Sequence, residues 1–238
     1  MHSLRARASN KTHIMSVVGI DLGNLNTVIA VARNRGIDVI CNEVSNRSTP
    51  TMVAFGPKSR ALGEAAKTQE ISNLRNTVGN LKRLLGRKAG DAAFEAVDRQ
   101  FMTCRMGATE AGDLAAIVGY LEEPERVFSG VELMGAFLGR VRETAQNELR
   151  VGVSDVVVSC PVHYTDAQRR ALMDAAEVAG LRCIRVLNDT TAAALAYGMP
   201  KAGDLSDEQP RNVAFVDLGQ SNLSVSIASF WKSRVEMR

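Results

Sequence analysis

The stretch VVGIDLGNLNTVIAVARN, residues 17–34, decides the fold, because VAFVDLGQSNLSVSIASF, residues 213–230, repeats its pattern. Each copy has an apolar strand, the tripeptide Asp-Leu-Gly, a polar turn and a second apolar strand. Identical residues recur at an offset of 196 residues around the turn, where Asp21 matches Asp217, Leu22 matches Leu218, Gly23 matches Gly219 and Asn26 matches Asn222. Repetition at that distance indicates a duplicated domain, since solenoid repeats have far shorter periods.

This hairpin pattern predicts a phosphate site. A glycine directly after a strand lets phosphate oxygens approach the turn, where successive backbone N–H groups bind anions. The aspartate cannot favour a phosphate by charge, so we expect Asp21 and Asp217 to hold a hydrated Mg²⁺ through water. Asp and Gly are also common in ordinary hairpin turns, which explains one copy equally well. Two copies favour a pair of facing hairpins around a metal-bound polyphosphate.

The N-terminal third of the chain predicts strands and then a less regular segment. Residues 16–40 favour three short antiparallel strands, with turns at GNLN and NRG. A strand in TMVAF follows Pro50, and a more helical stretch ends at Gly86. Residues 87–128 show weak periodicity, and we assign about 50–128 to a peripheral subdomain.

Residues 129–198 predict alternating helices and strands. Capping boxes at Ser129 with Glu132 and at Thr165 with Gln168 begin two helices. DVVVS is expected as a strand, RCIRVL as a buried strand and TTAAALAYG as another helix. This alternation is typical of an α/β layer arrangement. Residues 199–211 concentrate Pro, Gly and charge, and predict an exposed linker.

Composition excludes several classes of partner. The formal net charge of +3 is too small and scattered to favour nucleic acid or an anionic membrane. No apolar run reaches the roughly 18 residues of a membrane span, so we expect a soluble protein. The four cysteines form no CxxC pair, which favours free thiols, a reducing compartment and a cytoplasmic protein. Residues 1–14, basic and without acids, are expected to form a disordered extension rather than a transit peptide.

Six segments together resemble the 70-kDa heat-shock chaperone superfamily, from about Met15 to about Phe230. They are GIDLG, NEVSNRSTP, NTVGNLKRLLG, PVHYTDAQRRALMDAAEVAGL, RVLNDTTAAALAYG and VAFVDLGQSN. Two segments resemble its large 110-kDa branch, and their residues are similar to those of the fungal members: ARNRGIDVICNEVSNRSTP and VAFVDLGQSN. The resemblance implies an actin-like ATPase fold of the ribonuclease H-like class.

By this resemblance the chain divides into the first lobe of a nucleotide-binding domain, residues 15–198, the linker 199–211, and the start of a second lobe, residues 212–238. The final residues WKSRVEMR depart from a recognisable strand. We therefore expect a truncated second lobe, with apolar surface exposed around residues 212–230.

The resemblance also implies roles for single residues. Asp21 would face the waters of Mg²⁺, and Gly23, Asn24 and Leu25 would form the first phosphate loop. Lys82 would reach the γ-phosphate of ATP, although a solvated helix lysine is the plainer interpretation. Asp189 falls where the 70-kDa members carry a glutamate that orients the attacking water, and an acid at a helix N-terminus is its alternative. The second loop would comprise Asp217, Gly219, Gln220, Ser221 and Asn222.

Departures from the family pattern lie in both turns. Asn24 and Leu25 replace two threonines, and Ser224 replaces an aspartate. Gln220 and Ser221 replace two glycines and Asn222 replaces a threonine, so side chains obstruct the close approach that glycine permits. The lost hydroxyls and carboxylate remove hydrogen bonds near the reacting phosphate, and we expect at most weak ATPase activity.

The leading hypothesis is an ATP-binding fragment of a large heat-shock chaperone that uses ATP/ADP and Mg²⁺. The branch resemblance implies a nucleotide exchange factor and holdase co-chaperone in protein folding. Its partners would be a 70-kDa heat-shock chaperone and unfolded protein clients. An active chaperone ATPase or sugar-kinase-like phosphotransferase of the same fold is one alternative. A decayed interaction fragment that binds no nucleotide is the other, and we expect weak or no ATP binding from this chain alone.

Overall fold

A six-stranded sheet occupies the centre of the computed structural model, which describes residues 17–33 and 35–238. The prediction for residues 1–14 lies outside this range. The predicted antiparallel meander is confirmed as β1 (Val18–Leu22), β2 (Asn26–Arg33) and β3 (Gly36–Ile40). The short strand β4 (Thr49–Pro50) pairs with β2, whereas β11 (Asp155–Cys160) runs parallel to β1 and β12 (Arg182–Asn188) parallel to β11.

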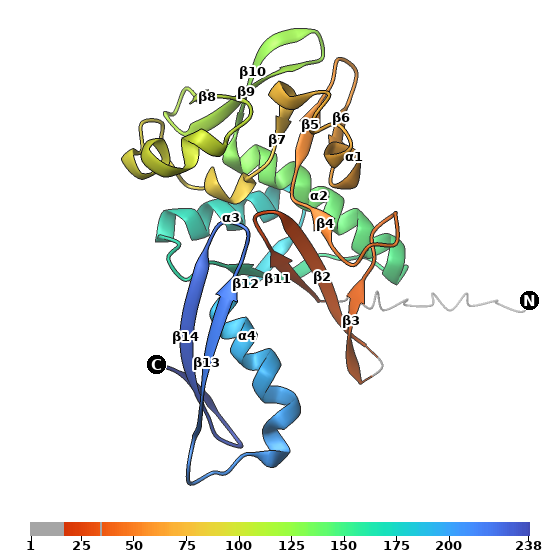
Figure 1. Cartoon of the computed structure of the whole chain (residues 1–238). Helices are drawn as coiled ribbons and strands as arrows, with labels where there is room; N and C mark the ends of the chain where they lie inside the picture. Colours follow the sequence, from red (N-terminus) through yellow and green to blue (C-terminus); the bar gives the residue numbers. More distant parts are fainter. Residues whose placement is uncertain (1–16, 34) are drawn as a thin grey trace, which may run out of the picture.

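Two long helices cover one face of this sheet (Figure 1). They are α2 (Gly130–Leu149) and α3 (Asp166–Val178), and both predicted capping boxes are present. Because side chains alternate along a strand, Val18, Ile20 and Leu22 of β1 point into the core shared with α2 and α3. Gly19 and Asp21 therefore lie on the opposite face, which borders the third helix, α4 (Asp189–Gly198).

The peripheral region differs from the sequence prediction. The strand predicted in TMVAF is confirmed as β5 (Val53–Phe55). Instead of a helical stretch up to Gly86, the structure then has β6 (Arg60–Leu62), the one-turn helix α1 (Glu64–Lys67) and β7 (Thr77–Val78). The helical turns that follow α1 in that stretch are two short 3₁₀ turns, at Leu74–Asn76 and Leu81–Arg83.

The weakly periodic segment 87–128 folds largely as an antiparallel sheet. A π-helical turn (Phe94–Asp98) and a 3₁₀ turn (Arg99–Phe101) come first. The sheet follows, with strands β8 (Arg105–Ala108), β9 (Leu114–Tyr120) and β10 (Glu123–Ser129).

The repeated hairpin forms a separate sheet at the C-terminal end. β13 (Arg211–Leu218) and β14 (Leu223–Phe230) pair antiparallel, and β15 (Val235–Met237) pairs with β14. The expectation that the final residues form no strand was wrong, because β15 extends this sheet. Tyr197 of α4 packs against both Phe215 and Phe230, which also contact each other, so an aromatic cluster holds the sheet against α4.

The other face of the hairpin carries the expected exposed apolar surface. Alternation along β13 and β14 puts five large apolar side chains there, each at least 47% exposed: Val216, Leu218, Leu223, Val225 and Ile227. The predicted linker is only partly open, since Met199–Asp204 form a 3₁₀ helix and Leu205 is buried against the second sheet.

Strand β12 was predicted to be buried, and this prediction was wrong. It is an edge strand in which Arg182, Ile184 and Arg185 are exposed. All four cysteines are free thiols, of which Cys104 and Cys160 are buried. In the part of the chain that the structure describes, no helix is long and apolar enough to cross a membrane.

Candidate functional site

The two Asp-Leu-Gly hairpins have related turns with different constraints at their glycines. At Gly23 an added Cβ would lie 2.0 Å from the backbone oxygen of Asn26, so the turn itself requires glycine. At Gly219 the nearest such contact is the oxygen of Asn222 at 3.5 Å, an ordinary van der Waals distance. Local geometry therefore explains Gly23, whereas Gly219 is free of this restriction.

Three predicted acids meet in one cleft between the central sheet, α4 and the second hairpin. Asp21, Asp189 and Asp217 line this space of about 550 Å³, whose other walls are mainly apolar. The arrangement brings together carboxylates from β1, from the start of α4 and from β13, which lie far apart in the sequence.

Asp21 is held by a serine on the neighbouring parallel strand. The hydroxyl of Ser159 donates to Oδ1 of Asp21 at 3.0 Å and accepts from the backbone N–H of Leu22 at 3.0 Å. Asp189 begins α4, and its Oδ1 accepts from the backbone N–H of Thr190 at 2.8 Å. Asp189 thus satisfies one N-terminal N–H of the helix while its carboxylate lines the cleft.

Lys82 lies beside these acids and is not a solvated surface lysine. Its Nζ donates to the backbone oxygen of Leu22 at 2.5 Å, at the end of the first hairpin strand. The hydroxyl of Tyr164 donates to the backbone oxygen of Lys82 at 2.6 Å and fixes the main chain there. Burial lowers the pKa of Lys82, while Asp189 and Asp21 act in the opposite direction.

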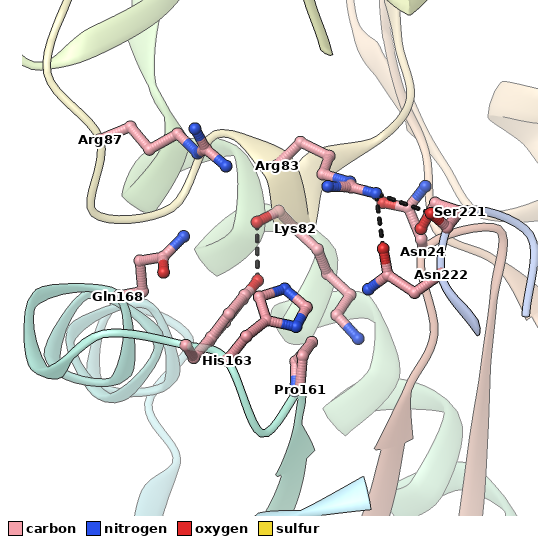
Figure 2. A pocket seen from close by; sticks show the side chains of 10 residues that line it. Asn24, Lys82, Arg83, Arg87, Pro161, His163, Gln168, Ser221 and Asn222 are labelled. Atoms are coloured by element: carbon pink, nitrogen blue, oxygen red, sulfur yellow. Dashed lines mark hydrogen bonds between the residues drawn. The ribbon is translucent and has the colours of Figure 1, made fainter. Parts of the chain in front are cut away.

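The tips of the two turns touch each other. Nδ2 of Asn24 donates to Oε1 of Gln220 at 2.5 Å and to Oδ1 of Asn80 at 2.6 Å. Arg83 donates to the backbone oxygen of Ser221 and to Oδ1 of Asn222 (Figure 2). The side chain of Gln220 therefore reaches across to the first turn.

Leu25 is joined to the neighbouring segment through its backbone, because its carbonyl oxygen accepts a hydrogen bond from the N–H of Thr51 at 2.9 Å. Together with Asn24 and Gln220, Leu25 lines a second cavity of about 130 Å³ next to the turns.

The donor set suits a hydrated divalent cation better than a directly bound metal. Within residues 17–33 and 35–238, no three metal-ligating side chains gather closely enough to hold an ion by themselves. Asp21 and Asp217 face a common cleft, and Mg²⁺ commonly keeps several waters while using one or two carboxylates. Asn24, whose buried Oδ1 has no hydrogen-bond partner in the described part of the chain, does not line this cleft but the smaller cavities beside the turns.

Several contacts in the site were not predicted from the sequence. Ser159 follows an apolar strand, but its contact with Asp21 depends on the parallel pairing of β11 with β1, which no local signal gives. Arg83 and Tyr164 adjoin predicted features, since Arg83 follows Lys82 and Tyr164 precedes the Thr165 capping box. Proximity to those features is the only signal that could have singled them out.

Comparison with known proteins agrees with this geometry. Residues 17–238 match the Hsp70 protein family. The chain belongs to the Hsp70 family. It is 54% identical over 226 residues to heat shock protein hsp88 of Neurospora crassa, which covers 94% of this chain and 31% of that protein. It is 44% identical to a heat shock protein homolog of Saccharomyces cerevisiae over 92% of this chain and 32% of the relative.

Human heat shock 70 kDa protein 4L is 45% identical over 94% of the chain and 26% of its own length. These similarities confirm the predicted 110-kDa branch of the Hsp70 family, and the family establishes the actin-like ATPase fold. The chain spans about a third or less of the length of these relatives. The Hsp70 family is one of nucleotide-binding chaperones, so the cleft lies on a fold that handles nucleotides.

Proposed function

We propose that this chain forms the ATP-binding part of a large Hsp70-family chaperone that acts as a cytoplasmic nucleotide exchange factor and holdase. The gathering of Asp21, Asp189 and Asp217 around one cleft, beside Lys82, carries the proposal. Asp21 and Asp217 come from the two copies of the repeated hairpin, which supports a single site that uses both.

In this proposal the two turns bind the phosphates of ATP or ADP, with residues 23–25 on one side and 219–222 on the other. Asp21 and Asp217 hold the waters of Mg²⁺, which supplies positive charge to the phosphates when bound. The Lys82 ammonium, close to Asp21 and Asp189, reaches the terminal phosphate. Ser159 keeps the Asp21 carboxylate in one orientation.

Weak ATPase activity is a second candidate, favoured by the position of Asp189 in the same cleft as Asp21. There Asp189 would orient the attacking water. Its bond to the N–H of Thr190 occupies one carboxylate oxygen, which supports slow rather than efficient turnover. The exchange activity, the 70-kDa chaperone partner and the unfolded clients follow from the branch resemblance and belong to the whole protein.

Calorimetric titration with Mg-ATP tests the nucleotide proposal. The titrations use this chain and a fusion in which the Neurospora crassa relative supplies the sequence after the matched region. We expect tight binding by the fusion, weak or no binding by the chain alone, and loss of binding in Asp21→Ala. Asp38→Ala is the matched control, because Asp38 is an exposed carboxylate two strands away that pairs with Arg33. Equal binding by the wild-type fusion and its Asp21→Ala variant would refute the site.

Release of labelled ADP from a 70-kDa chaperone tests the exchange activity separately. The fusion should accelerate release, and its Asp21→Ala variant should do so much less. No acceleration by a fusion that binds ATP would refute the exchange-factor role and leave the nucleotide site standing.

A further inference from the structure

The tip of the second hairpin is attached to the first part of the chain by side chains alone. Asn24 and Gln220 occupy equivalent positions of the two repeats, and their amides are joined by a hydrogen bond of 2.5 Å. In a pair of duplicated hairpins that face each other, equivalent residues meet only where the two copies approach most closely. The two turns therefore touch at equivalent positions of the repeat.

Arg83 makes the second attachment. Its Nη2 donates to the backbone oxygen of Ser221 at 3.0 Å and to Oδ1 of Asn222 at 2.8 Å. Figure 2 shows the guanidinium extended from the 3₁₀ turn toward Ser221 and Asn222 of the second hairpin, while the Lys82 side chain next to it runs downward in this view. The Arg83 side chain thus donates hydrogen bonds to both a main-chain and a side-chain acceptor of the second turn.

The guanidinium of Arg83 is itself anchored. Its Nη1 lies 3.2 Å from Oδ1 of Asp98, and Nη2 of Arg87 lies 3.3 Å from the other oxygen of the same carboxylate. The Asp98 side chain is 5% exposed, so Arg83 is paired with a buried carboxylate. A charged donor held by a buried carboxylate loses little freedom when it bonds to the turn, so its hydrogen bonds are stronger than those of a free surface arginine.

We propose that Arg83 is a positioning residue that clamps the second phosphate turn against the first without any nucleotide, assisted by the Asn24–Gln220 pair. The side chains at 220 and 222 take part in the clamp, and both positions depart from the glycine and threonine of the 70-kDa members. A glycine at 220 offers no side chain to Asn24. In this chain the two turns are therefore joined by the protein's own side chains.

The clamp adds a detail to the proposed nucleotide site, because a nucleotide would enter a site whose two turns are already in contact. Only this consequence rests on the proposed function. The contact itself involves no ligand and is tested without one.

Crosslinking of the two turns tests the clamp. Asn24→Cys and Gln220→Cys are introduced together, with Cys41→Ser and Cys183→Ser to remove the two partly exposed thiols. The rate of intramolecular crosslinking by a short bis-maleimide is followed by mass spectrometry in nucleotide-free buffer. These substitutions remove the Asn24–Gln220 hydrogen bond. The crosslinking rate therefore measures how well the hydrogen bonds of Arg83 alone keep the two turns close together. We expect rapid crosslinking in this background. Arg83→Ala should slow it about tenfold, because the substitution removes hydrogen bonds from a charged donor to the second turn.

Two further variants guard against a general loss of structure. Asn222→Ala removes one acceptor and leaves the Arg83–Asp98 pair intact, and it should slow crosslinking severalfold. Arg105→Ala is the matched control, because it removes an arginine from the exposed pair with Glu125 and should leave the rate unchanged. Circular dichroism verifies that each variant is folded.

Failure of the double-cysteine protein to crosslink would overturn the proposal, as would equal rates in the background protein, Arg83→Ala and Asn222→Ala. Because no nucleotide is present, these outcomes are independent of whether the chain binds ATP.

Discussion

Asp98→Asn should destabilise the protein more than its single charge suggests. Asp98 is 5% exposed and contacts Arg83 and Arg87, whose side chains are 21% and 16% exposed. Removing one partner of a buried ion pair costs about 3–5 kcal/mol because the other charge stays buried and unpaired. Here Arg87 keeps its second ion pair with Asp91 at 2.9 Å, and both arginines reach solvent. We therefore expect a loss of about 2–3 kcal/mol in the free energy of unfolding.

Urea unfolding followed by circular dichroism measures this loss. With an m-value of about 2 kcal/mol/M, the midpoint should fall by roughly 1 M. Asp113→Asn is the matched control, because Asp113 pairs with Lys88 at 2.6 Å where the two side chains are 45% and 68% exposed. Its expected cost is below about 1 kcal/mol. Equal midpoints for the two variants would refute the argument that burial of Asp98 makes its ion pairs important.

Three other substitutions probe the turns, the lysine and a helix cap. Gly23→Ala should cost about 2–3 kcal/mol because its Cβ meets the Asn26 oxygen, whereas Gly219→Ala should change stability by less than about 0.5 kcal/mol in urea titrations. Burial depresses the pKa of Lys82, so the folded state releases its proton at lower pH than the unfolded state. The wild type should therefore gain stability over Lys82→Met as pH rises from the folded-state pKa to 10.5, and a flat difference across unfolding measurements at several pH values would contradict this. Ser129→Ala should lower thermal stability by about 1 kcal/mol through loss of the capping box, and an unchanged melting curve would count against it.

Local signals predicted the elements that depend on neighbouring residues. The capping boxes at Ser129 and Thr165 and the hairpin turn after Asp21 all satisfy backbone groups within a few positions. Sheet order depends on distant pairing, and the two arginines of RCIRVL were the sign that β12 lies at an edge. The sheet in 105–129 was missed because charged side chains and a proline in β10 obscure its alternation.

The candidate site, like the fold, was predicted only in part from the sequence. The repeat and the family resemblance singled out Asp21, Lys82, Asp189 and Asp217, whose proximity in the structure supports the proposed roles. The partners that hold them come from other strands or turns, as Ser159 does for Asp21. Such contacts arise from packing between segments far apart in the chain, so a single sequence does not reveal them.

The most direct test of the central claim, that both hairpins form one Mg-nucleotide site, is the Mg-ATP affinity of Asp21→Ala, Asp217→Ala and the double variant, each in the fusion chain. Calorimetry should show at least a tenfold loss in each single variant and little further loss in the double variant, because either change removes a water-mediated contact of the same cation. Unchanged affinity in Asp217→Ala would contradict the claim, as would losses that simply add in the double variant, since the two hairpins would then not act as one site.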